Sequence, residues 1–442
     1  MPFGSTAALG LPGVGYVSLA EAAVFALWLA LIVHRVTLGQ ILATLRPFRP
    51  GFPLLLLLIW AAIGAVFLPR LLAGATELFV FVRRDEGSAI ILAPLAPFGT
   101  NLSQLARLAL AASVFVALAT VFRSQGNWRP VALALTVASF VHVALAILDL
   151  GSYAVGLPDL LDGLRTMDFA QLDNQVLLGI KRLTGGFPEA SSFAYYTIGL
   201  YGFWLRRWFG EPDRIFFALM VLVMIGLLLR STATSGYLSL GAYTLLFLFW
   251  QLGNLARTRQ AMTLSLVLAI GVPTAAIALA FIYSFVPGAP EFIERTLIGK
   301  LTTASGLERL SWNAQALVNF RETFTLGAGI GSVRASSWLL AALGSLGLLG
   351  TALYLWFIGA ALLQRPTVSE NLTANAEIGA ALQSGCAAIF VHSLLTKPYP
   401  NLEIPFFAMA GLAVGLLRQS WLRLSPLPEN PAQFIRSRQS AA

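Results

Sequence analysis

Apolar runs of about 20 residues recur along this chain, and they restrict its fold more than any other feature. Clear examples cover residues 52–72, 131–150 and 264–285. A helix needs about 20 mostly apolar residues to cross the hydrocarbon core of a bilayer. Of the 442 residues, 57% are hydrophobic and only 11% are charged, whereas a soluble domain carries about 25% charged residues. A soluble globular protein is therefore excluded, and a polytopic membrane protein is predicted.

The apolar pattern predicts an all-α, helical membrane bundle in which residues 1–424 form a single domain. About eleven transmembrane helices (10–12) are expected. Residues 425–442 contain three prolines and no apolar run, so they are predicted to form a mobile cytoplasmic tail. The expected spans are 18–36, 52–72, 102–122, 130–150, 188–207, 214–230, 234–252, 262–286, 337–363, 376–396 and 403–422.

The distribution of charge predicts the orientation of these spans. The net charge is +9, and most basic residues stand at the ends of apolar runs. Because cytoplasmic connections are enriched in Lys and Arg, the N-terminus is expected outside and the C-terminus inside. Topology explains the excess charge, and no nucleic-acid partner is expected. Two long polar stretches, about 151–187 and 287–336, then lie outside, where long connections usually carry function. The first is spaced like an amphipathic helix on the membrane surface.

Several catalytic signatures are absent from the sequence. There is no glycine-rich nucleotide loop followed by Lys and Ser or Thr, no His-Glu-x-x-His motif, and no paired acidic motif in the first outside loop. Cys386 is the only cysteine, and the chain has three histidines, so neither an internal disulfide nor a His-rich metal site is expected. We therefore expect no metal and no cofactor.

Arginine is instead concentrated in the segments predicted to lie outside. The guanidinium group is always charged, and its planar fork binds phosphate in a bidentate way. Several such groups near the headgroup level predict a site for the diphosphate of a lipid-linked substrate. The alternative is that they pair with Glu189, Glu308 or Glu322, or contact lipid headgroups. The basic candidates are Arg182, Arg230, Lys300, Arg309, Arg321 and Arg334.

Alternating glycines precede the span expected at 337–363. Gly327, Gly329 and Gly331 would allow the backbone to approach a ligand closely and to offer amide donors to an anion. Close packing of small residues between helices is the alternative explanation of the same pattern.

A succession of short motifs then resembles a known family. The motifs are RLTGGFPEASSF at 182–193, STATSG at 231–236, ERLSWN at 308–313, GAGIG at 327–331 and LGSLGLLG at 343–350. In this order and spacing, over about residues 181–354, the chain resembles the O-antigen polymerase and O-antigen ligase superfamily of bacterial envelope enzymes.

This resemblance implies a GT-C-like, inverting and metal-independent glycosyltransferase of the bacterial inner membrane. The donor would be a polyprenyl-diphosphate-linked glycan, whose reducing end is joined to an acceptor hydroxyl at the periplasmic face. Arg309 and Arg182 are the positions that best match the arginines holding the diphosphate in such families. A chain-length regulator and a flippase are the implied protein partners.

One departure from the family separates its two branches. Ligases usually carry His-Asn shortly after the glycine run, whereas this chain has Ser336 and Ser337 there, with Arg334 just upstream. Ser336 remains a candidate for substrate contact. The missing imidazole favours a polymerase of O-antigen, capsule or exopolysaccharide over a ligase that transfers glycan to a lipid or protein acceptor.

The general base has three candidates. Glu189 is the first because it begins a span on the outer side, although a carboxylate there also suits a helix N-terminus or an ion pair with Arg182. His392 is the rival, with a hydrogen-bonded packing residue as the alternative, and Glu308 is the third.

A transporter or flippase of lipid-linked oligosaccharide is the hypothesis from another class. Transporters place ionisable residues and broken helices at the bilayer midplane. Here most polar groups of note cluster outside, which favours an enzyme.

Overall fold

The structure is a computed structural model. It describes residues 1–11, 15–84, 87–167, 171–172, 175–177, 179–211, 214–252, 303–364 and 373–423, together with a few single positions between 267 and 294. Lys300, almost all of the expected span 262–286 and the tail 425–442 lie outside the described residues.

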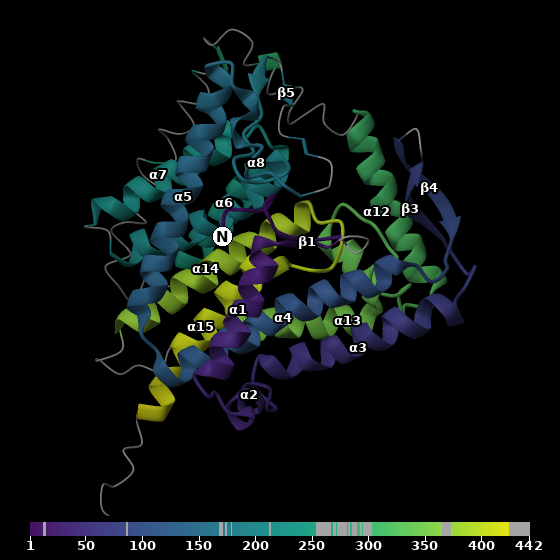
Figure 1. Cartoon of the computed structure of the whole chain (residues 1–442), viewed down its shortest axis with the longest axis horizontal. Coiled ribbons are helices and arrows are strands. Elements are labelled where there is room, and N and C mark those ends of the chain that lie inside the picture. The colour runs from purple at the N-terminus through teal and green to yellow at the C-terminus, as the bar shows by residue number, and fades with distance from the viewer. Residues whose placement is uncertain are drawn as a thin grey trace, which may run out of the picture.

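Ten of the expected spans coincide with helices, because each long apolar run is a local signal for helix (Figure 1). Their limits differ from the predicted ones by a few residues at most. The ten helices are α1 Leu19–Val33, α3 Gly51–Leu71, α4 Gly99–Gln125, α5 Trp128–Ala154, α6 Ala190–Gly210, α7 Ile215–Arg230, α8 Thr234–Leu252, α13 Trp338–Leu362, α14 Thr373–Leu395 and α15 Glu403–Arg423.

Half of these helices are long and apolar enough to cross a membrane. They are α3, α4, α5, α13 and α14, and three shorter apolar helices lie in α1, α7 and α15. A helix rises about 1.5 Å per residue, so each of these five helices is long enough to span the roughly 30 Å hydrocarbon core. The protein is thus a helical membrane protein by length and composition, while the total of about eleven spans stays a prediction.

Some elements were not expected from the sequence. The described residues include two further helices, α2 (Leu38–Thr44) and α12 (Ala304–Glu322), and three antiparallel hairpins. The hairpins are β1 (Ala7–Leu11) with β2 (Gly15–Ser18), β3 (Glu77–Arg84) with β4 (Gly87–Pro94), and β5 (Val176–Leu177) with β6 (Ile180–Lys181). An all-α description therefore holds for the bundle but not for its connections.

The amphipathic helix predicted within 151–187 is wrong for the residues described there. They form one 3-10 turn, Pro158–Leu161, and the β5–β6 hairpin. The reason is that the basic side chains of this segment turn inward to a buried carboxylate at the end of α5. Long-range polar contacts hold the segment, and the i,i+4 pairs of a surface helix do not form.

Helix α6 lies at the centre of the packing, against α7, α8 and α14. Two small residues allow this: a Cβ added at Gly202 would come within 2.7 Å of Ala388, and one at Gly199 within 2.8 Å of Ile389. Ser384 of α14 also donates a hydrogen bond to the carbonyl of Gly202 at 2.7 Å. Small residues that let two backbones approach are a common way to pack helices in membranes.

Helix α13 is interrupted at Gly347, whose φ of +67° lies in the left-handed region. The connection that precedes α13 fills this break. The amide of Leu348 donates to the carbonyl of Thr325 at 2.9 Å, and the amide of Ala328 donates to the carbonyl of Gly344 at 2.8 Å. Irregular backbone inside a membrane bundle is tolerated where protein satisfies its polar groups in this way.

Candidate functional site

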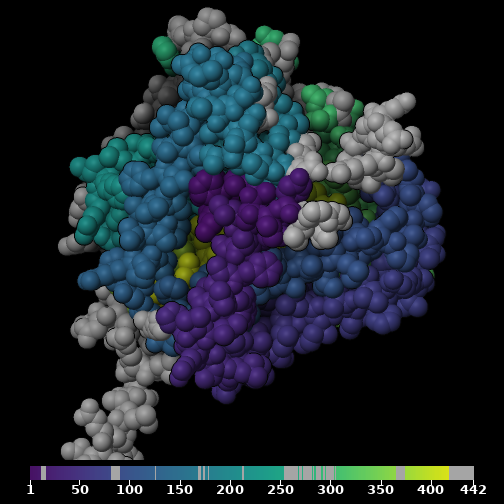
Figure 2. Space-filling view, in the orientation of Figure 1, coloured from purple at the N-terminus to yellow at the C-terminus, as the bar shows by residue number. Residues whose placement is uncertain are grey.

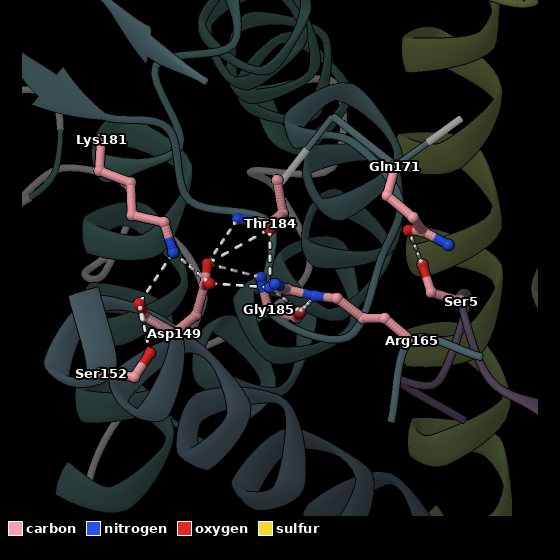
Figure 3. A network of polar contacts seen from close by, with 8 residues as sticks. All are labelled: Ser5, Asp149, Ser152, Arg165, Gln171, Lys181, Thr184 and Gly185. Atoms are coloured by element: carbon pink, nitrogen blue, oxygen red, sulfur yellow. Dashed lines mark hydrogen bonds and ion pairs between the residues drawn. The ribbon is translucent and has the colours of Figure 1, made fainter. Parts of the chain in front are cut away.

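A buried carboxylate, Asp149, organises one end of the bundle. Its side chain is fully buried at the end of α5 and accepts hydrogen bonds from Arg165 Nη2 at 2.7 Å and Lys181 Nζ at 2.5 Å (Figure 3). Its second oxygen accepts from the backbone amides of Thr184 and Gly185, both at 3.0 Å. One carboxylate thus holds two cations and the backbone that follows them.

This Asp149 network fixes the segment 181–189, which carries Arg182 and Glu189. The N-terminal segment packs beneath it: the amide of Ser5 donates to the carbonyl of Gly186 at 3.0 Å, and the amide of Met167 donates to the carbonyl of Ser5 at 3.1 Å. Figure 2 shows this N-terminal segment in purple against the blue surface of α5 and the residues after it. The N-terminus and the first long connection therefore share one side of the bundle.

Sequence reasoning missed Asp149, Arg165 and Lys181. The available signal was an acidic residue at the end of an apolar run. Ionisable residues in such runs are costly and usually have a partner. The partners themselves, 16 and 32 residues away, are not marked by any local pattern.

Arg182, which directly follows Lys181, lies beside three charged or polar groups. Its guanidinium donates to Gln175 Oε1 at 2.7 Å. Burial lowers the pKa of the Arg182 guanidinium, the carboxylate of Glu189 raises it, and the positive charge of Arg309 lowers it again. Glu189 and Arg309 are therefore both close enough to act on Arg182, although Arg309 comes from a distant part of the chain.

Two further arginines extend this group. Arg230, at the end of α7, donates from Nη1 to the carbonyl of Lys181 at 2.7 Å, directly before Arg182. The guanidinium carbon of Arg334 lies 4.5 Å from the centre of the Trp312 ring, and Trp312 stands one turn along α12 from Arg309. We refer to Arg182, Arg230, Arg309 and Arg334 as the arginine cluster.

The arginine cluster has unused capacity to bind an anion. None of its members forms an ion pair within 4.0 Å in the part of the chain that the structure describes. The Nε atoms of Arg182 and Arg334 are buried and have no hydrogen-bond partner there. A buried guanidinium donor without a partner costs free energy, so a ligand that supplies oxygen atoms would be stabilising. Arg309 is exposed and the other three are half-buried, so the cluster faces both solvent and protein.

The β3–β4 hairpin supports α12, which carries Arg309. Asn319 donates from Nδ2 to Thr76 Oγ1 at 2.7 Å, and Gln315 donates from Nε2 to the carbonyl of Glu77 at 2.8 Å. The fully buried side chain of Leu78 adds apolar packing on the same side of the helix. The hairpin thus sets the position of α12 relative to the arginine cluster.

Other predicted basic residues do not join the arginine cluster. Arg321 is exposed near the end of α12, 12 residues from Arg309 and therefore about 18 Å along the helix.

Ser336, the predicted substrate contact, is half-buried and lies beside α12. Its amide donates a hydrogen bond to Asn313 Oδ1 at 2.7 Å. Its carbonyl accepts from the amide of Lys397, a nearly buried residue that sequence reasoning also missed.

The glycine run packs against the backbone of neighbouring helices. Gly327, Gly329 and Gly331 have φ of +85°, +90° and +85° and are buried. A Cβ on each would meet backbone atoms of α13, α3 and α4 at 2.5, 2.7 and 2.3 Å. The close approach that the spacing predicted is therefore real, but the approaching groups belong to the protein itself. Ligand contact at these positions stays a prediction.

The three candidate bases differ in their surroundings. Glu189 is half-buried at the start of α6. One of its oxygens accepts from the hydroxyl of Ser191, and the other accepts no hydrogen bond from any described residue. His392 is fully buried in α14, and its Nδ1 lies 2.9 Å from Ser239 Oγ, which is the arrangement of a packing residue. Glu308 is exposed beside Arg309.

Glu189 and Glu308 are both accessible beside the arginine cluster, but of the three candidates only Glu189 is half-buried and acts on the charge of Arg182. Within the described residues, no three His, Cys, Asp or Glu side chains come close enough to hold a metal ion. No known family model, curated protein or solved structure matches the chain.

Proposed function

We propose that this protein is a membrane glycosyltransferase that polymerises lipid-diphosphate-linked oligosaccharide units. The observation that carries the proposal is the arginine cluster, four guanidinium groups from four segments that are linked through neighbouring residues and have no carboxylate ion pair among the described residues. Its position at the ends of apolar helices suits a substrate whose lipid lies in the bilayer and whose diphosphate lies at the surface.

The arginine cluster would act mainly on the leaving group. Negative charge grows on the diphosphate as the bond from its oxygen to the sugar breaks. Fixed cations that contact this group therefore stabilise the transition state more than the bound substrate. Arg182 is held by its hydrogen bond to Gln175, and Arg334 by its stacking over Trp312, so little rearrangement of these guanidinium groups is needed on binding.

Glu189 is the proposed general base. The hydroxyl of the acceptor attacks the anomeric carbon of the donor, and the bond from that carbon to the diphosphate oxygen breaks with inversion. The acceptor proton passes to the Glu189 carboxylate, and the diphosphate leaves with the bonding electron pair. Arg182 lies close to both Glu189 and Arg309. The two arginines would therefore hold the departing diphosphate near the proposed base.

The polymerase branch is preferred to the ligase branch because Ser336 stands where ligases of the resembled superfamily carry histidine. The chemistry at the arginine cluster is the same in both branches. They differ in the acceptor, which is the growing glycan in a polymerase and a separate lipid or protein in a ligase. We propose the periplasmic face of a bacterial inner membrane as the place of the reaction, with a flippase supplying the donor.

The test uses purified protein in lipid nanodiscs with lipid-diphosphate-linked repeat units, and the products are separated by size. We expect a ladder from the wild type and at least about 100-fold slower chain growth from Arg182→Ala and Arg309→Ala, since loss of one transition-state donor typically costs this much. Arg321→Ala is the matched control: it removes an exposed arginine from the same helix as Arg309, about 18 Å away, and should keep the wild-type rate.

Other product patterns have distinct meanings. Addition of one glycan to a separate acceptor would assign a ligase, and movement of intact donor across vesicles without a product would assign a transporter. A full-length ladder from both Arg182→Ala and Arg309→Ala would overturn the role of the arginine cluster.

A further inference from the structure

A second group of arginines lies at the opposite end of the bundle. Helix α2 and the turn after it meet the start of α3 and the ends of α4 and α15 there, at the lower end of Figure 1. Asn101 of α4 lies near the arginine cluster, where it donates a hydrogen bond to the carbonyl of Ile330. Arg123 lies 22 residues further along the same helix. This corresponds to about 33 Å, so the two groups of arginines cannot share one ligand head.

A hollow with about 220 Å³ of empty space opens between these elements, and part of that space is open to solvent. It is lined by Thr44, Arg49, Pro50, Ala119, Arg123 and Val414. Two of the lining side chains, Arg49 and Arg123, are cations, so the mouth of the hollow can meet an anion.

The charges around the hollow are all of one sign. Arg123 is repelled by Arg49 and by Arg46, which lies beside them. None of the three forms an ion pair within 4.0 Å in the described parts of the chain. Arg123 is oriented by a hydrogen bond from Nη2 to the carbonyl of Gln40 at 3.1 Å. Arginines that lie near one another without a carboxylate partner are stabilised when an anion enters between them.

The segment next to the hollow carries exposed apolar side chains. Phe48, between Arg46 and Arg49, is 97% exposed, and Leu38 and Leu42 of α2 are 69% and 52% exposed. A short segment with exposed apolar side chains and adjacent arginines is typical of a surface that lies in the membrane interface. A soluble anion would leave these side chains in water, whereas a lipid would cover them.

We infer that Arg46, Arg49 and Arg123 bind the phosphate of an anionic membrane phospholipid. The headgroup phosphate lies at the mouth of the hollow, against Arg49 and Arg123, and the acyl chains run along the apolar surface of α2 and Phe48. Basic pockets between membrane helices bind acidic lipid headgroups by the same chemistry. The site is independent of the proposed transferase reaction and would stay intact if that proposal failed.

The test measures lipid binding to delipidated protein in detergent by native mass spectrometry and by thermal unfolding. Phosphatidylglycerol is the anionic probe, phosphatidylcholine the zwitterionic probe and inorganic phosphate the soluble anion. We expect Arg123→Gln and Arg49→Gln to weaken phosphatidylglycerol binding about tenfold, since each removes a charge-assisted contact. Arg129→Gln is the matched control: Arg129 is exposed near the same end of the bundle, over the ring of Trp128, and its loss should not change binding.

Thermal unfolding without lipid separates this role from a structural one. Because the arginines repel one another, Arg123→Gln should unfold at the same or a higher temperature than the wild type when no lipid is present, yet gain less from phosphatidylglycerol. Equal lipid binding by Arg123→Gln, Arg49→Gln and the wild type would overturn the site. Stabilisation by inorganic phosphate as large as that by phosphatidylglycerol, or equal binding of phosphatidylcholine, would overturn the anionic lipid as its occupant.

Discussion

Replacement of Asp149 by Asn should release the segment that carries Arg182 and Glu189. The Asp149 side chain is completely buried, as are those of its two cationic partners, at 2% exposure for Arg165 and 1% for Lys181. Asparagine keeps the shape but removes the charge and replaces one acceptor oxygen with a donor. The cations Arg165 and Lys181 then lose their negative partner, and the amides of Thr184 and Gly185 lose all or part of their acceptor.

The expected cost follows from the contacts that remain. Removing one member of a buried ion pair typically costs about 3–5 kcal/mol. Lys181 keeps a hydrogen bond to the backbone carbonyl of residue 149 at 2.9 Å, and Arg165 keeps one to the carbonyl of Gly185 at 2.8 Å. These contacts compensate in part, so we expect a value near the lower end, about 3 kcal/mol.

The assay is hydrogen exchange of the purified protein, followed by mass spectrometry on peptides that cover residues 181–189. A loss of about 3 kcal/mol in local stability corresponds to roughly 100-fold faster exchange of the protected amides. The expected signal is confined to the amides of Thr184 and Gly185 and their neighbours. Asp159→Asn is the control, because Asp159 is an exposed carboxylate in the same connection.

A double variant provides a second check. Asp149→Asn combined with Lys181→Met removes one of the orphaned cations, so it should be more stable than the sum of the single changes by about 1–3 kcal/mol. Exchange of residues 181–189 at the wild-type rate in Asp149→Asn would refute the view that this carboxylate holds the segment.

The remaining predictions concern packing and chemistry. Gly327→Ala should destabilise the protein by at least about 2 kcal/mol in denaturant titrations, because the new Cβ would lie 2.5 Å from backbone. Gly74→Ala is the control: Gly74 has a positive φ but open space around it, so the change should cost about 1 kcal/mol. Equal costs for the two changes would contradict the packing role of Gly327. Glu189→Gln should lower kcat about 100-fold with little change in KM, whereas Glu308→Gln should leave both unchanged; a wild-type kcat for Glu189→Gln would reassign the base. His392→Ala should lower the melting temperature by loss of a buried hydrogen bond of about 1–3 kcal/mol, with turnover per folded molecule retained; lost turnover at unchanged stability would favour a catalytic imidazole.

The limits of the helices could be predicted from the sequence because the signal is local. The apolar run 52–72 corresponds to α3, Gly51–Leu71, and the run 234–252 corresponds to α8, Thr234–Leu252. The β3–β4 hairpin could not be predicted in this way. It is held against α12 by Asn319, which contacts Thr76 across 243 residues of chain, and no local pattern encodes such a distant partner.

The role predicted for the arginines stays a prediction, and the sequence indicated only part of their arrangement. Arginine outside the predicted spans was visible in the sequence. Arg309 of α12 does act on Arg182, and Arg334 lies over Trp312 of the same helix. Arg321 looked equivalent but lies near the other end of that helix. The spacing of the glycine run correctly predicted a close approach, but it could not indicate that the partner is the backbone of three neighbouring helices.

The amino-acid sequence by itself determined that this chain is a helical membrane protein and where most of its helices begin and end, because burial of apolar runs depends on composition over one helix length. The tertiary structure alone decided which arginines converge, that Asp149 pairs with Arg165 and Lys181, and that Arg123 meets Arg49 at the far end of the bundle. These arrangements depend on how distant segments pack. Charged groups at such junctions are positioned by contacts formed only after the helices have associated.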